Sequence, residues 1–476
     1  MNSFWLKCRS FVNSKYFALL IILIIAIPVC IVAKKNVIWL GDADNYWHYY
    51  FSKYAFQFPK FFLHHWGKPF FILLTAPVSH FGFYALNLFN ILCGLSSAYL
   101  LFKWSKLLNY RFAFFAIILL MAAPIYLSAV QSALTEPLFS FILLASSFLF
   151  FKEKYFWGAL LASTLMYTRT EGLLIMPIYA FYLLIRKEWK YIPLLATTFI
   201  IYSFIGLLAG RGFLWYFTEN PYNPVSPYGH GTWNHFIIRY DYSFGLPLLL
   251  LFFIGLFIII GKMVLNKDYI FWKAKSNEFK IFCLAFVPSL TFFAFHAYAW
   301  YAGKYASAGL ERVMASIVPL VVIVAMGGVN ILASIRFNLI RIPLFMVYFY
   351  FLQDATFLHF SYPTTAYGAE KVEMEAAQWF TKIREPGSKI YYAHPAFVFY
   401  ADYNPFDEDN KECFGFPNSN CIPYEGNQKF YYIWDSWFCE SSCGNKLSDI
   451  ENCPNLKKMR EFKDGDLFHL VFFESK

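Results

Sequence analysis

The sequence predicts an α-helical polytopic membrane protein with about 11 transmembrane helices and a small C-terminal extracytoplasmic α/β domain. Hydrophobic residues make up 59% of the 476 residues and charged residues only 15%, and the mean hydropathy is +0.44. Apolar runs of roughly the 20 residues that cross a bilayer recur through the first three quarters of the chain. Beyond residue 358 charged residues, Asn, Gly and Pro return, which indicates a soluble domain.

The apolar runs give the predicted spans. They fall near residues 16–33, 82–102, 112–130, 137–151, 155–168, 172–185, 191–209, 245–261, 281–299, 313–333 and 342–358. The first run has a basic flank like that of a signal peptide, but no small-residue cleavage site follows it, so we interpret it as an uncleaved first span. The chain thus divides into a transmembrane domain, residues 1–358, and a soluble domain, residues 359–476.

Lysine and arginine predict the orientation, because short loops rich in these residues stay on the cytoplasmic side. They gather before the first span and in every second loop after it, which places the N-terminus inside and the C-terminal domain outside. These loops account for most of the net charge of +10, so we infer no nucleic-acid partner. The first outer loop, residues 34–68, breaks the rule. Either the orientation fails there or its lysines serve an anionic partner: Lys34, Lys35, Lys53, Lys60 and Lys68.

The soluble domain is predicted to contain one amphipathic helix and three strands. The helix is expected at 369–383 and the strands at 389–400, 429–434 and 467–473. The domain also holds five cysteines, whose clustering outside a membrane favours disulfides: Cys413, Cys421, Cys439, Cys443 and Cys453. Zinc is the competing interpretation, since Cys439 and Cys443 have the spacing of metal ligands.

A paired acidic motif, Asp42-Ala-Asp44-Asn45, follows the first span directly. In an extended segment, carboxylates two residues apart point to one side. Asp42 and Asp44 could then hold a divalent cation such as Mg²⁺ or Mn²⁺, or leave one carboxylate free as a base. The alternative is an exposed turn or helix cap, for which Asp and Asn are also suited.

Further charged residues on the predicted outer side are candidates for binding a ligand, because a charge near the membrane is costly unless it is paired or faces water. Lys68, after His64 and His65, could neutralise a phosphate, although snorkelling to the interface explains it equally well. Arg312 could grip a phosphate in a bidentate manner or pair within the bundle. The full set of candidate substrate-binding residues is Lys68, His65, Glu136, Arg169, Glu171, Glu311 and Arg312.

Some of these candidates also have structural explanations. Glu136 complements the positive end of a helix that begins with Pro137. Arg169 and Glu171 stand two residues apart, which on a helix does not bring them together, so each is expected to find a partner elsewhere. Another outer loop carries His230, His235, Arg239 and Asp241 without ligand spacing. No nucleotide-binding glycine loop, Gly-x-Ser-x-Gly elbow or His-Glu-x-x-His motif is present, so a cytoplasmic nucleotide substrate is not expected.

These features together resemble the GT-C superfamily of integral membrane glycosyltransferases. Asp42-Ala-Asp44-Asn45-Tyr46-Trp47 is similar to its Asp-x-Asp type motif, and Gly67-Lys68-Pro69-Phe70 resembles the Gly-x-Lys-Pro-Pro segment of its aminoarabinose transferases, with Phe70 in place of the second proline. Thr135-Glu136-Pro137-Leu138, 168–172 and 309–313 look like segments of bacterial members assigned as mannosyltransferases. The resemblance covers nearly the whole membrane region by arrangement, while each motif is short.

The resemblance implies a location in a bacterial inner membrane and a hexosyl transfer, with mannose as one candidate sugar, from a polyprenyl phosphate carrier to a glycan, lipid or protein acceptor on the outer face. Asp44 or Asp42 would then be the general base. Lys68, Arg169 and Arg312 would neutralise the departing phosphate, and Glu136, Glu171 and Glu311 would orient those cations or the sugar. Two alternatives stay open. A transporter or flippase of lipid-linked sugars would have repeated halves, which we do not find, and a non-catalytic assembly factor would lack the acidic motif.

Overall fold

The structure is a computed structural model that describes residues 11–12, 14–35, 42–272, 274–335, 342–343, 346, 348, 368–412, 428–440 and 444–476. The chain divides into two compact units. The first comprises the described residues of Met1–Lys34 and Phe51–Tyr362, and the second those of Lys35–Tyr50 and Pro363–Lys476. The predicted domain boundary at residue 358 lies outside the described residues.

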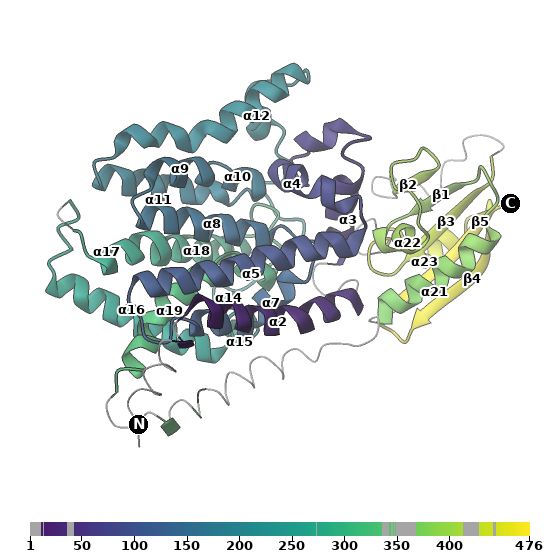
Figure 1. Ribbon diagram of the computed structural model, residues 1–476. Helices are drawn as coiled ribbons and strands as arrows, with labels where there is room; N and C mark the ends of the chain where they lie inside the picture. Colours follow the sequence, from purple (N-terminus) through teal and green to yellow (C-terminus); the bar gives the residue numbers. More distant parts are fainter. Residues whose placement is uncertain are drawn as a thin grey trace. The chain divides into compact units, whose positions relative to one another are not determined.

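The first unit is built of helices stacked side by side (Figure 1). In chain order these are α2 (Lys15–Lys35), η1 (Pro59–Leu63), α4 (Pro69–Ser79), α5 (Phe83–Leu107), α6 (Phe115–Ala122), α7 (Pro124–Val130), α8 (Glu136–Phe151), α9 (Tyr155–Ala162), α10 (Leu165–Thr168), α11 (Gly172–Ile185), η2 (Trp189–Ala196), α12 (Thr197–Leu208), α13 (Trp215–Thr218), α14 (His235–Ile238), α15 (Tyr240–Ser243), α16 (Leu246–Leu265), α17 (Asn277–Ile281), η3 (Phe282–Phe286), α18 (Val287–Tyr301), η4 (Glu311–Ser316) and α19 (Val318–Leu332). Helix α3 (Asp42–Lys53) contributes its last three residues to this unit and the rest to the second.

Five of the described helical segments are long and apolar enough to cross a membrane, judged by length and composition. They span Lys15–Lys35, Phe83–Leu107, Trp189–Leu208, Leu246–Leu265 and Asn277–Tyr301. Shorter apolar helices accompany them, so the predicted count of about 11 spans stays a prediction. These shorter helices are α4, α8, α11 and α19.

Two predicted spans are broken in the structure. The run near 112–130 divides into α6 and α7 at Ala123, whose backbone is extended (φ −69°, ψ 118°). The physical reason is Pro124, because a proline disfavours the helical conformation of the residue before it. The run near 155–168 likewise divides into α9 and α10. Helix α4, in contrast, was not predicted as a separate helix.

Close helix contacts are made possible by glycine. A Cβ atom on Gly255 of α16 would lie 2.1 Å from the carbonyl oxygen of Val324 in α19, and one on Gly328 would lie 2.6 Å from the carbonyl oxygen of Leu251. Small residues let helix backbones approach in this way where lipid provides no hydrophobic driving force between helices. This contact joins α16 to the buried helix α19.

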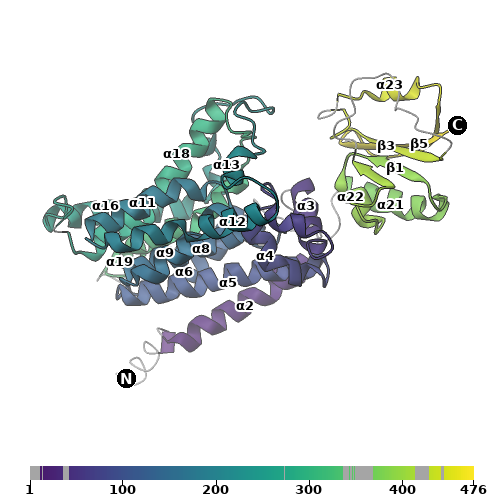
Figure 2. The same cartoon turned by 90° about the horizontal axis from the view of Figure 1, so that it is seen from above.

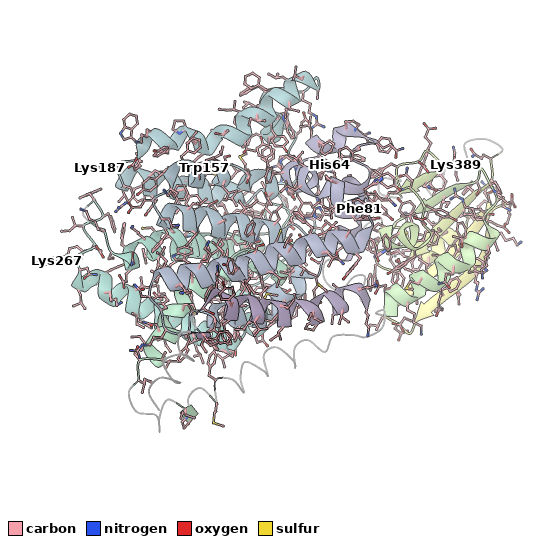
Figure 3. All side chains as sticks on the ribbon, in the orientation of Figure 1. His64, Phe81, Trp157, Lys187, Lys267 and Lys389 are labelled. Carbon is pink, nitrogen blue, oxygen red and sulfur yellow. The ribbon has the colours of Figure 1, made fainter. Side chains whose placement is uncertain are left out.

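The labelled side chains mark two ends of the helical unit. Lys187 and Lys267, which lie in basic loops, are at one end of the stack, and His64 and Phe81 are at the other (Figure 3).

The second unit contains a five-stranded sheet with the strand order β2-β1-β3-β5-β4 among the described residues. The strands are β1 (Lys389–Tyr392), β2 (Asn410–Glu412), β3 (Phe430–Asp435), β4 (Leu456–Asp464) and β5 (Phe468–Ser475). Strand β1 pairs in parallel with β2 and β3, and β5 pairs antiparallel with β3 and β4. Helices α21 (Gly368–Ile383) and α22 (Pro395–Tyr400) cover one face and α23 (Leu447–Glu451) the other (Figure 2).

Aromatic side chains fill both faces of the sheet, because successive residues of a strand point to opposite sides. Phe380 of α21 packs on Tyr431 and Phe472, with ring centroids 4.9 and 5.4 Å apart. On the other face Tyr432 and Trp434 join a core that includes two of the cysteines, Cys439 and Cys453. The other three cysteines, Cys413, Cys421 and Cys443, lie outside the described residues, so the disulfide pairing stays a prediction.

The predicted strand at 389–400 was wrong in its second half. The strand β1 ends at Tyr392, and α22 follows because His394 caps its N-terminus. Its Nδ1 accepts a hydrogen bond from the backbone N–H of Ala396, and Pro395 occupies the first helical turn. Strands β2 and β4 were not predicted, since β4 is rich in charged residues that mask its alternation.

Candidate functional site

Helix α3 carries the paired acidic motif. The helix begins at Asp42, whose side chain lies outside the described part of the chain, and Asp44 stands in its first turn, half-buried. The expectation of an extended segment was therefore wrong. On a helix two positions apart are about 200° around the axis, so the backbone does not direct both residues to one side. Acidic residues are nevertheless favoured in this first turn, because the N–H groups there have no partner within the helix.

Lys68 follows a tight turn at the start of α4. The N–H of Gly67 donates a hydrogen bond to His64 Nδ1 at 3.0 Å, and the His64 ring stacks on Phe51 with centroids 4.0 Å apart. Lys68 itself has φ +68°, a conformation that side-chain-bearing residues rarely adopt. Such backbone strain costs on the order of 1–3 kcal/mol and persists only where the surroundings impose it. The turn therefore holds Lys68 in one defined direction.

The ammonium group of Lys68 is buried. The residue is 5% exposed, and its Nζ donates to Thr170 Oγ1 at 2.8 Å and lies 4.6 Å from the centre of the Tyr222 ring. Among the residues that the structure describes, no carboxylate forms an ion pair with it. Burial lowers the pKa of Lys68 to about 7; the Glu171 carboxylate raises that pKa and the Arg169 guanidinium lowers it. Lys68 thus changes its charge near neutral pH.

His65 packs among aromatic side chains. Its ring stacks on Tyr216 with ring centroids 4.3 Å apart, and its centroid lies 6.0 Å from that of the Tyr222 ring. Burial lowers the pKa of His65 to about 3, with a further contribution from the Lys68 charge. His65 is therefore neutral near pH 7 and adds no positive charge beside Lys68.

Arg169, Glu136 and Glu171 form one buried ionic network. Arg169 Nη1 lies 2.7 Å from Glu136 Oε1 and 3.1 Å from Thr135 Oγ1, and its Nη2 lies 2.7 Å from Glu171 Oε1. The expectation that Arg169 and Glu171 do not meet was wrong, because Arg169 is extended (φ −153°, ψ 140°) at the junction of α10 and α11. The Arg169 charge holds the pKa of Glu171 well below its usual range, against the opposing effect of burial.

This network compensates Arg169 with two carboxylates. His296 of α18 extends it, with its Nε2 3.3 Å from Glu171 Oε1. Thr170, between Arg169 and Glu171, accepts the hydrogen bond from Lys68, so the Lys68 site and the network adjoin. Since Arg169 is already paired twice, Lys68 is the cation of this cluster whose charge is least compensated.

Glu311 belongs to a separate cluster. Its carboxylate lies 3.2 Å from Arg239 Nη1 and 3.6 Å from His235 Nε2, and the same His235 nitrogen is 2.8 Å from the carbonyl oxygen of Gly309. Arg312 follows in η4. The loop that carries His235 is also tied to the next one by the bridge between Val225 and Lys304.

Sequence reasoning missed several residues of these clusters. Thr170 and Tyr222 carry no charge, so the search for charged residues passed over them. His235 was given little weight because it lacks ligand spacing, and Arg239 was named without a role. Both pair with Glu311, which lies 72 to 76 residues further along the chain. These residues are identified only by their contacts in the tertiary structure.

Within the described residues, no group of three or more His, Cys, Asp or Glu side chains has the arrangement of a metal site. The helical backbone at 42–44 also does not favour joint chelation by a residue pair two positions apart. We therefore derive no step through a metal ion.

Solved structures with a similar fold are ArnT from Cupriavidus metallidurans. The apo state has a TM-score of 0.65 at 12% sequence identity and covers 96% of this chain and 97% of that one. The state bound to undecaprenyl phosphate has a TM-score of 0.63 at 11% identity and covers 97% and 98%. An oligosaccharyltransferase from Archaeoglobus fulgidus tethered with an acceptor peptide, at 14% identity over 85% and 61%, has a TM-score of 0.48, which is too low to support an inference.

No protein-family model matches the sequence, and no curated protein matches it at a significant level. The chain has the fold of these ArnT structures, which agrees with the fold that the sequence resemblance led us to expect. At identities of 11% and 12% the likeness concerns the fold alone, because one fold can host many unrelated activities.

Proposed function

We propose that this protein is a membrane glycosyltransferase that moves a sugar from a polyprenyl phosphate carrier to an acceptor hydroxyl at the outer face of a bacterial inner membrane. The observation that carries the proposal is the buried Lys68, which forms no ion pair within the described residues and lies beside Thr170 and Tyr222. A lysine that is costly to bury is retained where an anionic ligand restores its charge. The GT-C fold, and the undecaprenyl phosphate bound to ArnT, support this choice of ligand.

The proposed reaction needs a base and a site for the leaving group. The oxygen of the acceptor hydroxyl forms a bond to the anomeric carbon, the bond from that carbon to the phosphate oxygen breaks, and the configuration inverts. Asp44 takes the hydroxyl proton, and Asp42 is the alternative base. The departing polyprenyl phosphate keeps the bonding electrons, and Lys68 stabilises the charge that develops on it.

Arg169 receives a different role from the one expected. Because Glu136 and Glu171 already neutralise it, we propose that the network positions Thr170 and thereby Lys68. Glu311 and Arg312 lie in the neighbouring loop cluster and are proposed to contribute to binding the sugar or the acceptor. Mannose is one candidate sugar, on sequence resemblance.

We propose the orientation in the membrane from the distribution of lysine and arginine among the loops. The basic loops of Lys187 and Lys267 lie at the end of the helical unit opposite His64 (Figure 3), which is the arrangement expected if the basic end faces the cytoplasm.

Binding of undecaprenyl phosphate to the purified protein tests the ligand without knowledge of sugar or acceptor. Lys68→Ala should weaken binding about tenfold to about a hundredfold, the loss expected for a charge-assisted hydrogen bond, and Lys68→Arg should retain most of it. Lys304→Ala, on the bridge to Val225, is the matched lysine control. Equal affinity of the wild type and Lys68→Ala would remove Lys68 from the proposal.

Transfer in isolated membranes tests the chemistry. The membranes are supplied with radiolabelled undecaprenyl phosphate sugars, with mannose, glucose and aminoarabinose compared. Asp44→Asn should lower transfer by about 10²- to 10⁴-fold, the usual contribution of a general base, while leaving binding of undecaprenyl phosphate unchanged. Full transfer by Asp42→Asn, Asp44→Asn and their combination would exclude an aspartate base here. Sugar movement across the bilayer without transfer would favour a flippase.

A further inference from the structure

The acidic helix α3 is packed against the C-terminal part of the second unit. Residues 42–50 of this helix and residues 368–476 belong to that one unit, although more than 300 residues separate them in sequence. Tyr46 packs on Phe399 with ring centroids 5.0 Å apart, and Tyr49 packs on the same ring at 5.9 Å. Phe399 belongs to α22, so the acidic helix packs on α22.

Polar contacts fix the same position. Tyr50 donates its hydroxyl to the carbonyl oxygen of Pro395 at 3.5 Å. Tyr46, which is 1% exposed, donates its hydroxyl to the hydroxyl of Tyr400 at 3.4 Å. Tyr400 in turn donates to the carboxylate of Glu370. A chain of hydroxyl groups therefore runs from α3 through α22 to α21.

Helix α22 also lies close to α21 at its N-terminus. The cap residue His394 has its Nδ1 2.8 Å from Glu373 Oε1 of α21, and both residues are buried. Trp47 adds a contact with Phe406 at 6.2 Å. The tyrosines of α3 thus pack on α22, which the hydrogen bond from Tyr400 to Glu370 joins to α21.

The position of Asp44 depends on this packing. Asp44 is in the first turn of a helix of 12 residues, and a helix that short is marginal in water unless tertiary contacts hold it. The first turn frays most easily, because its N–H groups lack partners within the helix. Tyr46 comes two residues after Asp44, so its contacts act on this turn directly.

We propose that the C-terminal domain positions the catalytic acidic helix through Tyr46 and Tyr400, with Glu370 orienting the Tyr400 hydroxyl. Tyr46, Tyr400 and Glu370 are thus positioning residues for Asp44. This inference rests on the proposed function, in which Asp44 is the base.

The test compares Tyr46→Phe and Tyr400→Phe in the full-length protein. Each should lower kcat for transfer about tenfold, because loss of one hydrogen bond loosens the turn that holds the base. The KM for the lipid-linked sugar and the affinity for undecaprenyl phosphate should stay within about twofold of the wild-type values. Each variant removes a hydroxyl that is proposed to position Asp44 and not to bind the lipid. The double variant should be no worse than Tyr400→Phe, because Tyr400→Phe already removes the hydrogen bond from Tyr46 together with the one to Glu370.

Two controls separate positioning from general damage. Tyr403→Phe removes a hydroxyl three residues beyond Tyr400, on a ring that packs on Arg384, and should leave kcat unchanged. Glu370→Gln keeps an acceptor for the Tyr400 hydroxyl and should retain more activity than Glu370→Ala.

Hydrogen exchange supplies a readout independent of activity. The amides of residues 43–50 should exchange faster in Tyr46→Phe and Tyr400→Phe than in the wild type or in Tyr403→Phe. If both variants keep the wild-type kcat and the wild-type rates of amide exchange while Asp44→Asn is inactive, the positioning role is overturned. The proposed function would then still stand. Full activity of Asp44→Asn would instead overturn the base on which this inference rests.

Discussion

Arg169 and Glu136 form a buried ion pair in which Nη1 lies 2.7 Å from Oε1, with side-chain exposures of 12% and 3%. The pair joins α8 to the junction between α10 and α11, and Glu171 adds a second carboxylate to the same guanidinium. The junction carries Thr170, which holds Lys68. An internal ion pair thereby supports the proposed phosphate site.

Breaking this pair should destabilise the protein. Glu136→Gln leaves the buried guanidinium less compensated, which is expected to cost about 3 kcal/mol, as for other buried pairs that lose one partner. The measurement is the thermal unfolding midpoint in detergent. Glu385→Gln is the matched control, since Glu385 and Lys429 approach to 2.6 Å on the surface and should contribute no more than about 1 kcal/mol. Equal midpoints for the two variants would contradict the structural role of Glu136.

Binding of undecaprenyl phosphate should depend on pH through Lys68. With its pKa lowered to about 7 by burial, Lys68 is mostly protonated at pH 6 and mostly neutral at pH 8, so affinity should fall about tenfold over this range. The groups around it are Thr170, Tyr222, Glu171, Arg169 and His65, and His65 stays neutral because its pKa is lowered to about 3.

The Lys68→Arg variant is the reference for this pH series. Arginine stays charged from pH 6 to pH 8, so the fall in affinity caused by loss of the Lys68 charge should be absent in this variant. Titration of the phosphate itself affects both proteins equally. The same decline in both proteins would show that Lys68 is not the group responsible.

A methyl group on Gly172 should disrupt the ionic network of Arg169, Glu136 and Glu171 by moving the backbone that carries it. A Cβ there would lie 2.4 Å from the carbonyl carbon of Leu165 and 2.4 Å from the backbone nitrogen of Met166. These are backbone atoms that cannot turn aside, so Gly172→Ala should separate α10 from α11 and lower the unfolding midpoint and undecaprenyl phosphate binding together. Gly261→Ala, at a helical position with nothing within 4 Å, should be neutral or stabilising by about 1 kcal/mol.

Disulfides are expected in the C-terminal domain if it faces the outside. Mass spectrometry of the unreduced protein should find bridges among Cys413, Cys421, Cys439, Cys443 and Cys453 and leave one of the five unpaired. The thiols of Cys30, Cys93 and Cys283, which are free in the structure, should serve as internal controls. Five reduced thiols with bound zinc would favour the alternative metal interpretation.

Sequence alone determined the features that depend on composition and local pattern. Long apolar runs gave helices such as α5 and α16, because every backbone polar group in a bilayer must be satisfied within the segment. The helix α21 and strands β3 and β5 followed from their periodicity. The short motifs around Asp44 and Lys68 resembled those of the GT-C superfamily, and the chain has the fold of the ArnT structures.

Tertiary structure decided how the charged residues are partnered. Arg169 meets Glu171 because the backbone between them is extended, and it meets Glu136 across helices; neither follows from spacing. Lys68 is distinguished from a snorkelling lysine by its burial against Thr170 and Tyr222. The acidic motif forms a helix seated on Tyr400 and Phe399. Each of these facts depends on contacts between distant segments, which local sequence patterns do not encode.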